Sequence, residues 1–191
     1  MPLARWTGGG PRERAVDKCE ESGEKSRKRA GVLHPNGFAD RLADVSLDDL
    51  AASGIRGIIV DLDNTLIGYG LEEVADHDTA WIEEARKRGF ALALVSNNFT
   101  DRVRRASEKL GVPAVPNALK PLPRGFSTAL RIIGTPKDAT IVIGDQLFTD
   151  VLGAKLVGLR VILTRPIVAH DWYGTRVLRF FERLVLGSRR A

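Results

Sequence analysis

The chain alternates between short runs of Val, Ile and Leu and longer stretches in which apolar residues recur at helical spacing. Short runs of this kind are typical of strands buried on both faces of a sheet. Five such strands are expected, at residues 57–62, 90–96, 112–115, 139–144 and 159–164. Four intervening stretches are long enough for helices, at residues 72–88, 100–110, 124–133 and 147–157. The alternation predicts an α/β fold, a parallel sheet with helices on both faces.

The two ends of the chain depart from this pattern. Residues 1–30 combine mixed charges and glycines with hardly any apolar side chains, which is typical of a disordered segment. We therefore expect a disordered basic extension at 1–30 and one folded domain over 31–191. Within that domain residues 172–186, WYGTRVLRFFERLVL, predict a basic amphipathic helix. Such a helix either docks on the sheet with its arginines in water or lies on an anionic bilayer.

The charge of the chain is concentrated in these two ends. Of the net +5, residues 1–30 carry +3, residues 172–191 carry +4, and the segment between them carries −2. The predicted core is therefore not a nucleic-acid-binding surface. Cys19 is the one cysteine, and no apolar run approaches the length that spans a bilayer. We expect a cytoplasmic protein, with peripheral contact at the inner face of a membrane left open.

Polar side chains gather where the predicted strands end. The candidate residues are Asp61 and Asp63 after the first strand, Ser96 and Asn97 at the second, Lys120 after the third, and Asp145 and Asp150 after the fourth. Because the carboxyl ends of parallel strands share one edge of the sheet, these side chains are expected to meet there. Four carboxylates in one place need positive charge, which Lys120 and a divalent cation would supply. Carboxylate oxygens suit Mg²⁺, with Asp61, Asp63, Asp145 and Asp150 as its candidate ligands.

These residue types suit phosphoryl transfer. An Asp just beyond a strand end can attack phosphorus when a metal offsets its charge, which makes Asp61 the candidate nucleophile. Asp63 projects from the same side of the extended backbone and can protonate the leaving alcohol. Ser96 can bind phosphoryl oxygens, Asn97 can line the same site, and Lys120 can offset the charge that moves with the phosphoryl group.

Four motifs in this order resemble those of the haloacid dehalogenase (HAD) superfamily. They are DLDNT at 61–65, SNN at 96–98, KP at 120–121 and GDQLFTD at 144–150. The resemblance implies a Rossmann-like sheet and an Mg²⁺-dependent phosphoryl transferase with an Asp nucleophile. The presence of Asp63 favours a phosphatase over the dehalogenase and phosphonatase branches.

A narrower resemblance rests on GIRGIIVDLDNTL, LVSNN, GDQLFTDVLGAK and a late TRVLRFFER. These segments resemble the YqeG branch of HAD subfamily IIIA, whose eukaryotic relatives include mitochondrial phosphatidylglycerophosphate phosphatase. The gaps from Asp63 to Ser96 and from Lys120 to Asp145 hold one helix and one strand each, which leaves no room for a cap domain. An uncapped site would stay open to a large or surface-bound substrate.

Phosphatidylglycerophosphate is therefore the expected substrate, an anionic phospholipid that the enzyme would meet at a membrane surface. Two alternatives remain. The first is a phosphatase that acts on a soluble phosphorylated metabolite or protein. The second is a weakly catalytic binding or regulatory module that keeps the phosphate site. The oligomeric state stays open.

Overall fold

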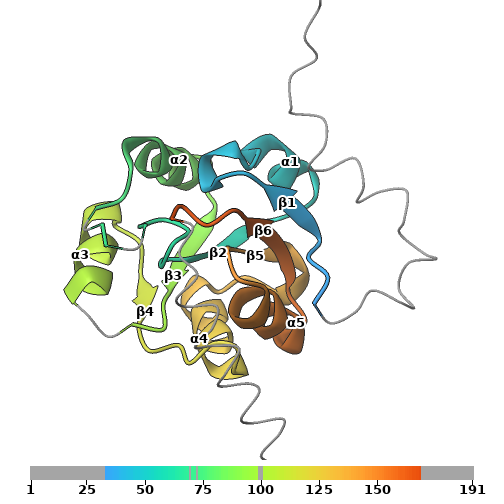
Figure 1. Ribbon diagram of the computed structural model, residues 1–191. Helices are drawn as coiled ribbons and strands as arrows, with labels where there is room; N and C mark the ends of the chain where they lie inside the picture. Colours follow the sequence, from blue (N-terminus) through green and yellow to red (C-terminus); the bar gives the residue numbers. More distant parts are fainter. Residues whose placement is uncertain (1–32, 69, 72, 99–100, 169–191) are drawn as a thin grey trace, which may run out of the picture.

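The computed structural model describes residues 33–68, 70–71, 73–98 and 101–168 (Figure 1). The predicted extension at 1–30 and the predicted helix at 172–186 lie outside these residues. In the described part of the chain, no helix has the length and apolar character needed to cross a membrane.

The centre of the fold is a six-stranded parallel sheet in the order β1-β6-β5-β2-β3-β4. Its strands are β1 (Gly37–Ala39), β2 (Gly57–Asp61), β3 (Ala91–Val95), β4 (Ala114–Val115), β5 (Thr140–Gly144) and β6 (Arg160–Thr164). All residues of β2 and β5 are buried, as their continuous apolar runs predict. The five predicted strands and the α/β class are confirmed.

Strand β1 is an addition to the prediction of about five strands. It pairs with β6 at the sheet edge and is three residues long. Phe38, its central residue, is exposed. A short edge strand with an exposed apolar residue lacks the buried apolar run by which the other strands were recognised.

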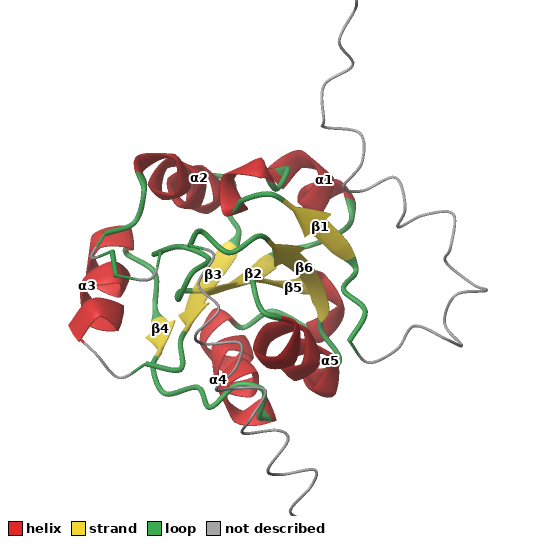
Figure 2. Ribbon diagram, in the orientation of Figure 1, coloured by secondary structure: helices red, strands yellow, loops and turns green. Residues whose placement is uncertain are grey.

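Helices cover both faces of the sheet (Figure 2). One face packs against α1 (Leu47–Ala52), α2 (Asp76–Lys87) and α3 (Asp101–Leu110), and the other against α4 (Pro123–Ile133) and α5 (Leu152–Val157). The four predicted helical stretches are confirmed, although the last begins as a π-helical turn, Leu147–Val151, before α5. Helix α1 was not predicted because its six residues are too few to show a helical period.

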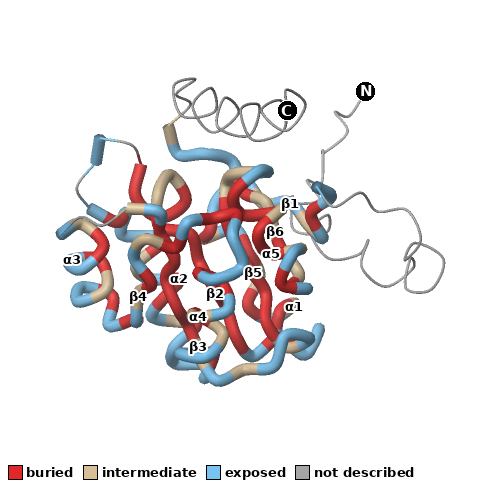
Figure 3. The backbone as a smooth tube through the Cα atoms, turned by 90° about the horizontal axis from the view of Figure 1, so that it is seen from below, coloured by how far each residue is buried: buried red, intermediate tan, exposed pale blue. Residues whose placement is uncertain are grey.

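Alternate residues of each central strand point to opposite faces, so the sheet divides the core in two. In β2, Ile58 and Val60 pack with α1, α2 and α3, while Ile59 packs with α4 and α5. Figure 3 shows the resulting core as buried backbone running through the centre of the molecule, with exposed residues around it. The sheet is thereby held rigidly from both sides.

The strand order reverses direction between β2 and β5. The chain runs outward from β2 through β3 to β4, and then returns to the other side of β2 to form β5 and β6. Ligands of such sheets bind beyond the carboxyl ends of the strands at this reversal. Among the described residues, the segments that leave β2 and β4 contain no further helix or strand before α2 and α4.

Candidate active site

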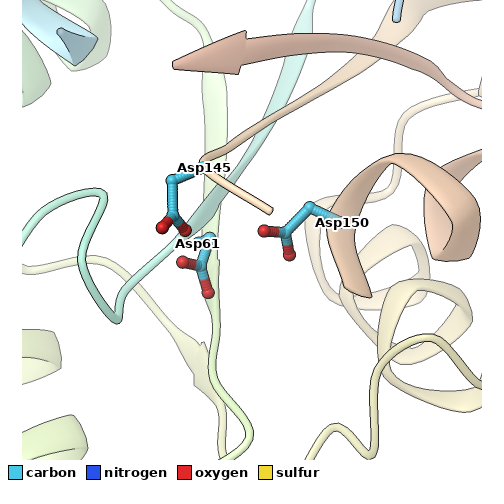
Figure 4. Close-up of side chains that lie close together, drawn as sticks. All are labelled: Asp61, Asp145 and Asp150. Atoms are coloured by element: carbon cyan, nitrogen blue, oxygen red, sulfur yellow. The ribbon is translucent and has the colours of Figure 1, made fainter. Parts of the chain in front are cut away.

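The carboxyl ends of β2 and β5 bring three carboxylates together at the reversal. Asp61 is the last residue of β2, Asp145 follows β5, and Asp150 lies in the π-helical turn. One oxygen from each carboxylate lies within 4.8 Å of the other two. Figure 4 shows the three side chains close together, with the carboxylates of Asp145 and Asp150 directed toward Asp61. The predicted convergence of Asp61, Asp145 and Asp150 is therefore present.

Lys120 reaches this cluster from the loop after β4. Its ammonium donates to Asp61 Oδ1, and to Asp150 Oδ1 at 2.7 Å. The Lys120, Asp61 and Asp150 side chains are almost completely buried. The ammonium thus connects the loop after β4 to carboxylates that lie 59 and 30 residues away in the chain.

Thr65 links the other pair of carboxylates. Its hydroxyl lies 3.1 Å from Asp61 Oδ2 and 3.2 Å from Asp145 Oδ1, and it can donate to one of them at a time. Thr65 was not among the site residues expected from the sequence. Its position, two residues after Asp63 in the DLDNT motif, was the only signal that it belongs to the site.

Asp63 occupies a separate place beside this cluster. Its carboxylate accepts hydrogen bonds from the Ser96 hydroxyl and, at 2.9 Å, from Asn98 Nδ2. Asn98 also donates its backbone N–H to the Ser96 hydroxyl at 3.0 Å. Asp63 therefore faces Ser96 and Asn98 rather than the three carboxylates. Asn98 was not among the site residues expected from the sequence, because a contact of this kind has no signature in residue spacing.

Asn97 positions the loop that carries Lys120. Its Oδ1 accepts the Lys120 backbone N–H at 2.7 Å, and its Nδ2 donates to the Lys120 carbonyl at 3.2 Å. Both polar ends of the side chain are thus bonded to the same residue. This contact connects the end of β3 to the loop after β4.

The loops that hold the site contain unusual backbone conformations. In the described residues, the three non-glycine residues with positive φ are Asn64 at 67°, Asn117 at 47° and Leu119 at 53°. Asn tolerates this left-handed region, whereas a Leu there is a genuine outlier. Such conformations persist where the surrounding contacts hold them, and they concentrate at functional sites.

Gly144 allows Asp150 to approach the end of β5. A Cβ atom at Gly144 would lie 2.6 Å from Asp150 Cγ, which no real contact permits. Asp150 Oδ2 also accepts the backbone N–H of Gln146 at 3.1 Å. The glycine and the π-helical turn after it together place the Asp150 carboxylate against Lys120.

The electrostatics of the cluster are dominated by burial. Burial raises the pKa of Asp61 well above its usual range, Lys120 acts in the opposite direction, and the charges of Asp150 and Asp145 add to the rise. Burial, followed by the charge of Asp150, raises the pKa of Asp145 to about 7. Burial alone would lower the pKa of Lys120, but Asp150 and Asp61 outweigh it and hold that pKa above its usual value.

The donor set fits a hard divalent cation. Three carboxylates face one ammonium, so the cluster has an excess of acceptor oxygens and of negative charge. Two oxygens on opposite sides of one Mg²⁺ are about 4.2 Å apart, since each bond is about 2.1 Å long. The three oxygens lie within 4.8 Å of one another, so one ion would hold them after a small inward movement of the carboxylates.

Comparisons with known proteins agree with this geometry. A family model described as haloacid dehalogenase-like hydrolase matches residues 69–158. The chain is 36% identical over 154 residues to "Probable phosphatase YqeG" of Bacillus subtilis (strain 168), an alignment that covers 81% of this chain and 90% of that protein. It is 34% identical over 92 residues to the phosphoserine phosphatase of Thermus thermophilus, covering 44% of this chain and 37% of that protein.

Similarity to solved structures is weaker. NagD from E. coli K-12 superposes on 57% of this chain and 87% of its own length, with a TM-score of 0.49 and 14% sequence identity.

Replacement of Lys120 tests the charge balance of the cluster. In Lys120→Met, Asp61 and Asp150 stay buried without their counter-charge. We expect the free energy of unfolding, measured with urea in the presence of a chelator, to fall by about 3–5 kcal/mol. Lys137→Met is the matched control, because Lys137 is exposed in the 3₁₀ turn Lys137–Ala139 that precedes β5, at the other edge of the sheet. Equal free energies of unfolding for the two variants would contradict the claim that Lys120 compensates the buried charges of Asp61 and Asp150.

Proposed function

The chain belongs to the haloacid dehalogenase-like hydrolases and is a phosphatase, and on this basis we propose that it hydrolyses a phosphomonoester through an aspartyl-phosphate on Asp61. One observation carries the proposal: Asp61 is buried at the end of β2, between the Lys120 ammonium and the Thr65 hydroxyl. A carboxylate held in this way at a sheet reversal is oriented toward the place where ligands bind.

The first half of the reaction uses Asp61 and Asp63. An oxygen of Asp61 attacks the phosphorus atom, and the bond from phosphorus to the ester oxygen breaks. Asp63 donates a proton to that oxygen as the alcohol leaves. In the second half Asp63 takes a proton from water, the water oxygen attacks phosphorus, and the bond to Asp61 breaks. Phosphate leaves, and both carboxylates return to their starting state.

Hydrogen bonds support the role of Asp63. Ser96 and Asn98 both donate hydrogen bonds to the Asp63 carboxylate, and these bonds fix its orientation. Asp63 is two residues from Asp61 in the chain. When substrate arrives, the Ser96 hydroxyl turns away from Asp63 and binds a phosphoryl oxygen. Asp63 is then free to exchange its proton with the substrate.

Lys120 and Asn97 are the residues that we assign to binding the phosphoryl group. Lys120 carries the positive charge that offsets the negative charge of the phosphoryl oxygens as bonds form and break. The two bonds from Asn97 to the Lys120 backbone support a positioning role, and a direct contact of Asn97 with phosphate remains part of the proposal.

Mg²⁺ is the proposed cofactor. Asp61, Asp145 and Asp150 would hold it, and Asp63, whose carboxylate lies with Ser96 and Asn98, would join them only by turning. When bound, the ion would neutralise the charge of the phosphate that approaches Asp61. Oxygen-only ligation favours Mg²⁺ over metals that prefer nitrogen or sulfur.

Phosphatidylglycerophosphate is the proposed substrate, with phosphatidylglycerol as the product. Two points support it: the resemblance to the YqeG branch, whose eukaryotic relatives include mitochondrial phosphatidylglycerophosphate phosphatase, and the lack of a cap over the site in the described residues. With this substrate the enzyme would work as a peripheral protein on the inner face of a membrane. A soluble phosphorylated metabolite or protein is the alternative.

Two Asp variants separate the roles of nucleophile and acid. Asp61→Asn is nearly isosteric and should remove all turnover of an aryl phosphate while the melting temperature changes little. Asp63→Asn should slow turnover on the order of 10² to 10⁴, because it loses proton transfer in both halves. Asp138→Asn, in the same 3₁₀ turn as Lys137, is the control and should retain full activity. Turnover above a few per cent in Asp61→Asn would exclude it as the nucleophile.

The substrate is tested by phosphate release from phosphatidylglycerophosphate in mixed micelles, with and without Mg²⁺, beside a soluble aryl phosphate. We expect Mg²⁺-dependent release with a strong preference for the lipid. Release from the aryl phosphate alone would support phosphatase activity and exclude phosphatidylglycerophosphate as the substrate. No release from either would support the binding or regulatory module instead.

A further inference from the structure

Arg102 lies in the first turn of α3 and contacts the loop that follows Asp63. Its Nη2 donates to the carbonyl oxygen of Ile67 at 2.9 Å and to that of Gly68 at 3.0 Å. These partners lie 35 and 34 residues before it in the chain. The two hydrogen bonds therefore join α3 to the loop at residues 64–68, which begins directly after Asp63.

The Ile67 carbonyl connects Arg102 to the residue next to Asp63. It accepts the Asn64 backbone N–H at 2.8 Å in addition to Arg102 Nη2, as a carbonyl with two lone pairs can. Asn64 has a φ of 67°, a conformation that non-glycine residues keep where surrounding contacts hold them. Arg102 thus supports the bond that holds the backbone directly after Asp63.

The segment that carries Arg102 also holds the Asp63 side chain. Ser96 and Asn98, which lie between β3 and α3, donate hydrogen bonds to the Asp63 carboxylate. Arg102 follows Asn98 by four residues, at the start of α3. The end of β3 and the start of α3 therefore hold both the carboxylate of Asp63 and the backbone that follows it.

The environment of Arg102 differs from that of an ordinary surface arginine. Its Nε is buried and has no hydrogen-bond partner among the residues that the structure describes. A buried donor without a partner is unfavourable for folding, and native proteins contain few of them. Arg104, two residues further along, is 63% exposed and pairs with Glu108 of its own helix. The unpartnered Nε indicates that Arg102 is placed for its contacts with the loop rather than for the stability of α3.

We propose that Arg102 is a positioning residue for proton transfer by Asp63. By holding the Ile67 and Gly68 carbonyls, it keeps the backbone after Asp63 in the conformation that directs the carboxylate toward the reacting oxygen. The inference rests on the proposed function, in which Asp63 protonates the leaving alcohol and later takes a proton from water. Arg102 needs no contact with the substrate for this role.

The variant Arg102→Met removes the donors and keeps an unbranched side chain that suits a helix. With an aryl phosphate that has a good leaving group, it should form the aspartyl-phosphate on Asp61 almost as fast as the unchanged chain, because little protonation is needed. Hydrolysis of this intermediate should slow by about tenfold to a hundredfold, since small errors of position have effects of this size. Acid quench during a single turnover measures both steps.

Two further variants separate positioning from a general loss of folding. Arg104→Met removes an exposed arginine of the same helix and is the matched control, which should hydrolyse the intermediate at the normal rate. Arg102→Lys can still bond one of the two carbonyls, so its rate should fall between those of Arg102→Met and the unchanged chain. If Arg102→Met does not fold, as its melting curve would show, Arg102→Lys carries the same comparison.

A double variant tests whether Arg102 acts through Asp63. In Asp63→Asn, the addition of Arg102→Met should change the rate of hydrolysis by less than about twofold, because the proton transfer that Arg102 supports is already lost. Hydrogen exchange gives a readout that needs no activity. The Asn64 backbone N–H should exchange faster in Arg102→Met than in Arg104→Met, because the Ile67 carbonyl that accepts it is less firmly held.

Equal rates of hydrolysis in Arg102→Met and Arg104→Met would overturn the positioning role. So would a slowing by Arg102→Met that is equally large with and without the Asp63 carboxylate. These results differ from a failure of the proposed function, in which the unchanged chain would release no phosphate from any phosphomonoester tested. Faster exchange at Asn64 in that case would retain the contact of Arg102 with the loop and exclude proton transfer by Asp63.

Discussion

The contact on which the site depends is the buried Lys120 ammonium between Asp61 and Asp150. A single buried carboxylate would be costly, and so would a buried lysine. Together they compensate each other, and because the three residues come from different elements, the ion pairs also fix where those elements lie. The balance is incomplete, since Asp145 adds a further carboxylate to the same cluster. This remaining negative charge is what makes the edge suited to a divalent cation and a phosphate group.

The sheet explains why these residues can meet. Parallel strands place their carboxyl ends at one edge, and the reversal of strand order between β2 and β5 opens space there for Asp61 and Asp145. Two further contacts position the site residues. Gly144 has no side chain and so lets Asp150 approach the end of β5, and Asn97 hydrogen-bonds the Lys120 backbone to the end of β3. The apolar clusters on the two faces of the sheet hold its carboxyl edge in place. This support allows Leu119 in the site loop to keep a positive φ.

Much of this could be predicted from the sequence, because buried parallel strands have continuous apolar runs and their ends are marked by polar residues. The long central strands, the helices between them and the meeting of Asp61, Lys120, Asp145 and Asp150 all follow from that pattern. Short elements such as β1 and α1 do not, since three to six residues show no period. Thr65 and Asn98 were missed, and Asp63 lies apart from the three carboxylates, because such contacts depend on distances between loops rather than on spacing in the chain.

The proposed mechanism requires that phosphate passes through Asp61, and the covalent intermediate itself is the most direct evidence for it. An aryl phosphate with a good leaving group needs little protonation, so Asp63→Asn should form the intermediate and hydrolyse it slowly. The measurement is an acid quench of this variant early in turnover, followed by peptide mapping by mass spectrometry. We expect a phosphorylated peptide that contains Asp61 and loses its phosphate to hydroxylamine. Phosphate on another residue, or turnover without any phosphorylated peptide, would contradict it.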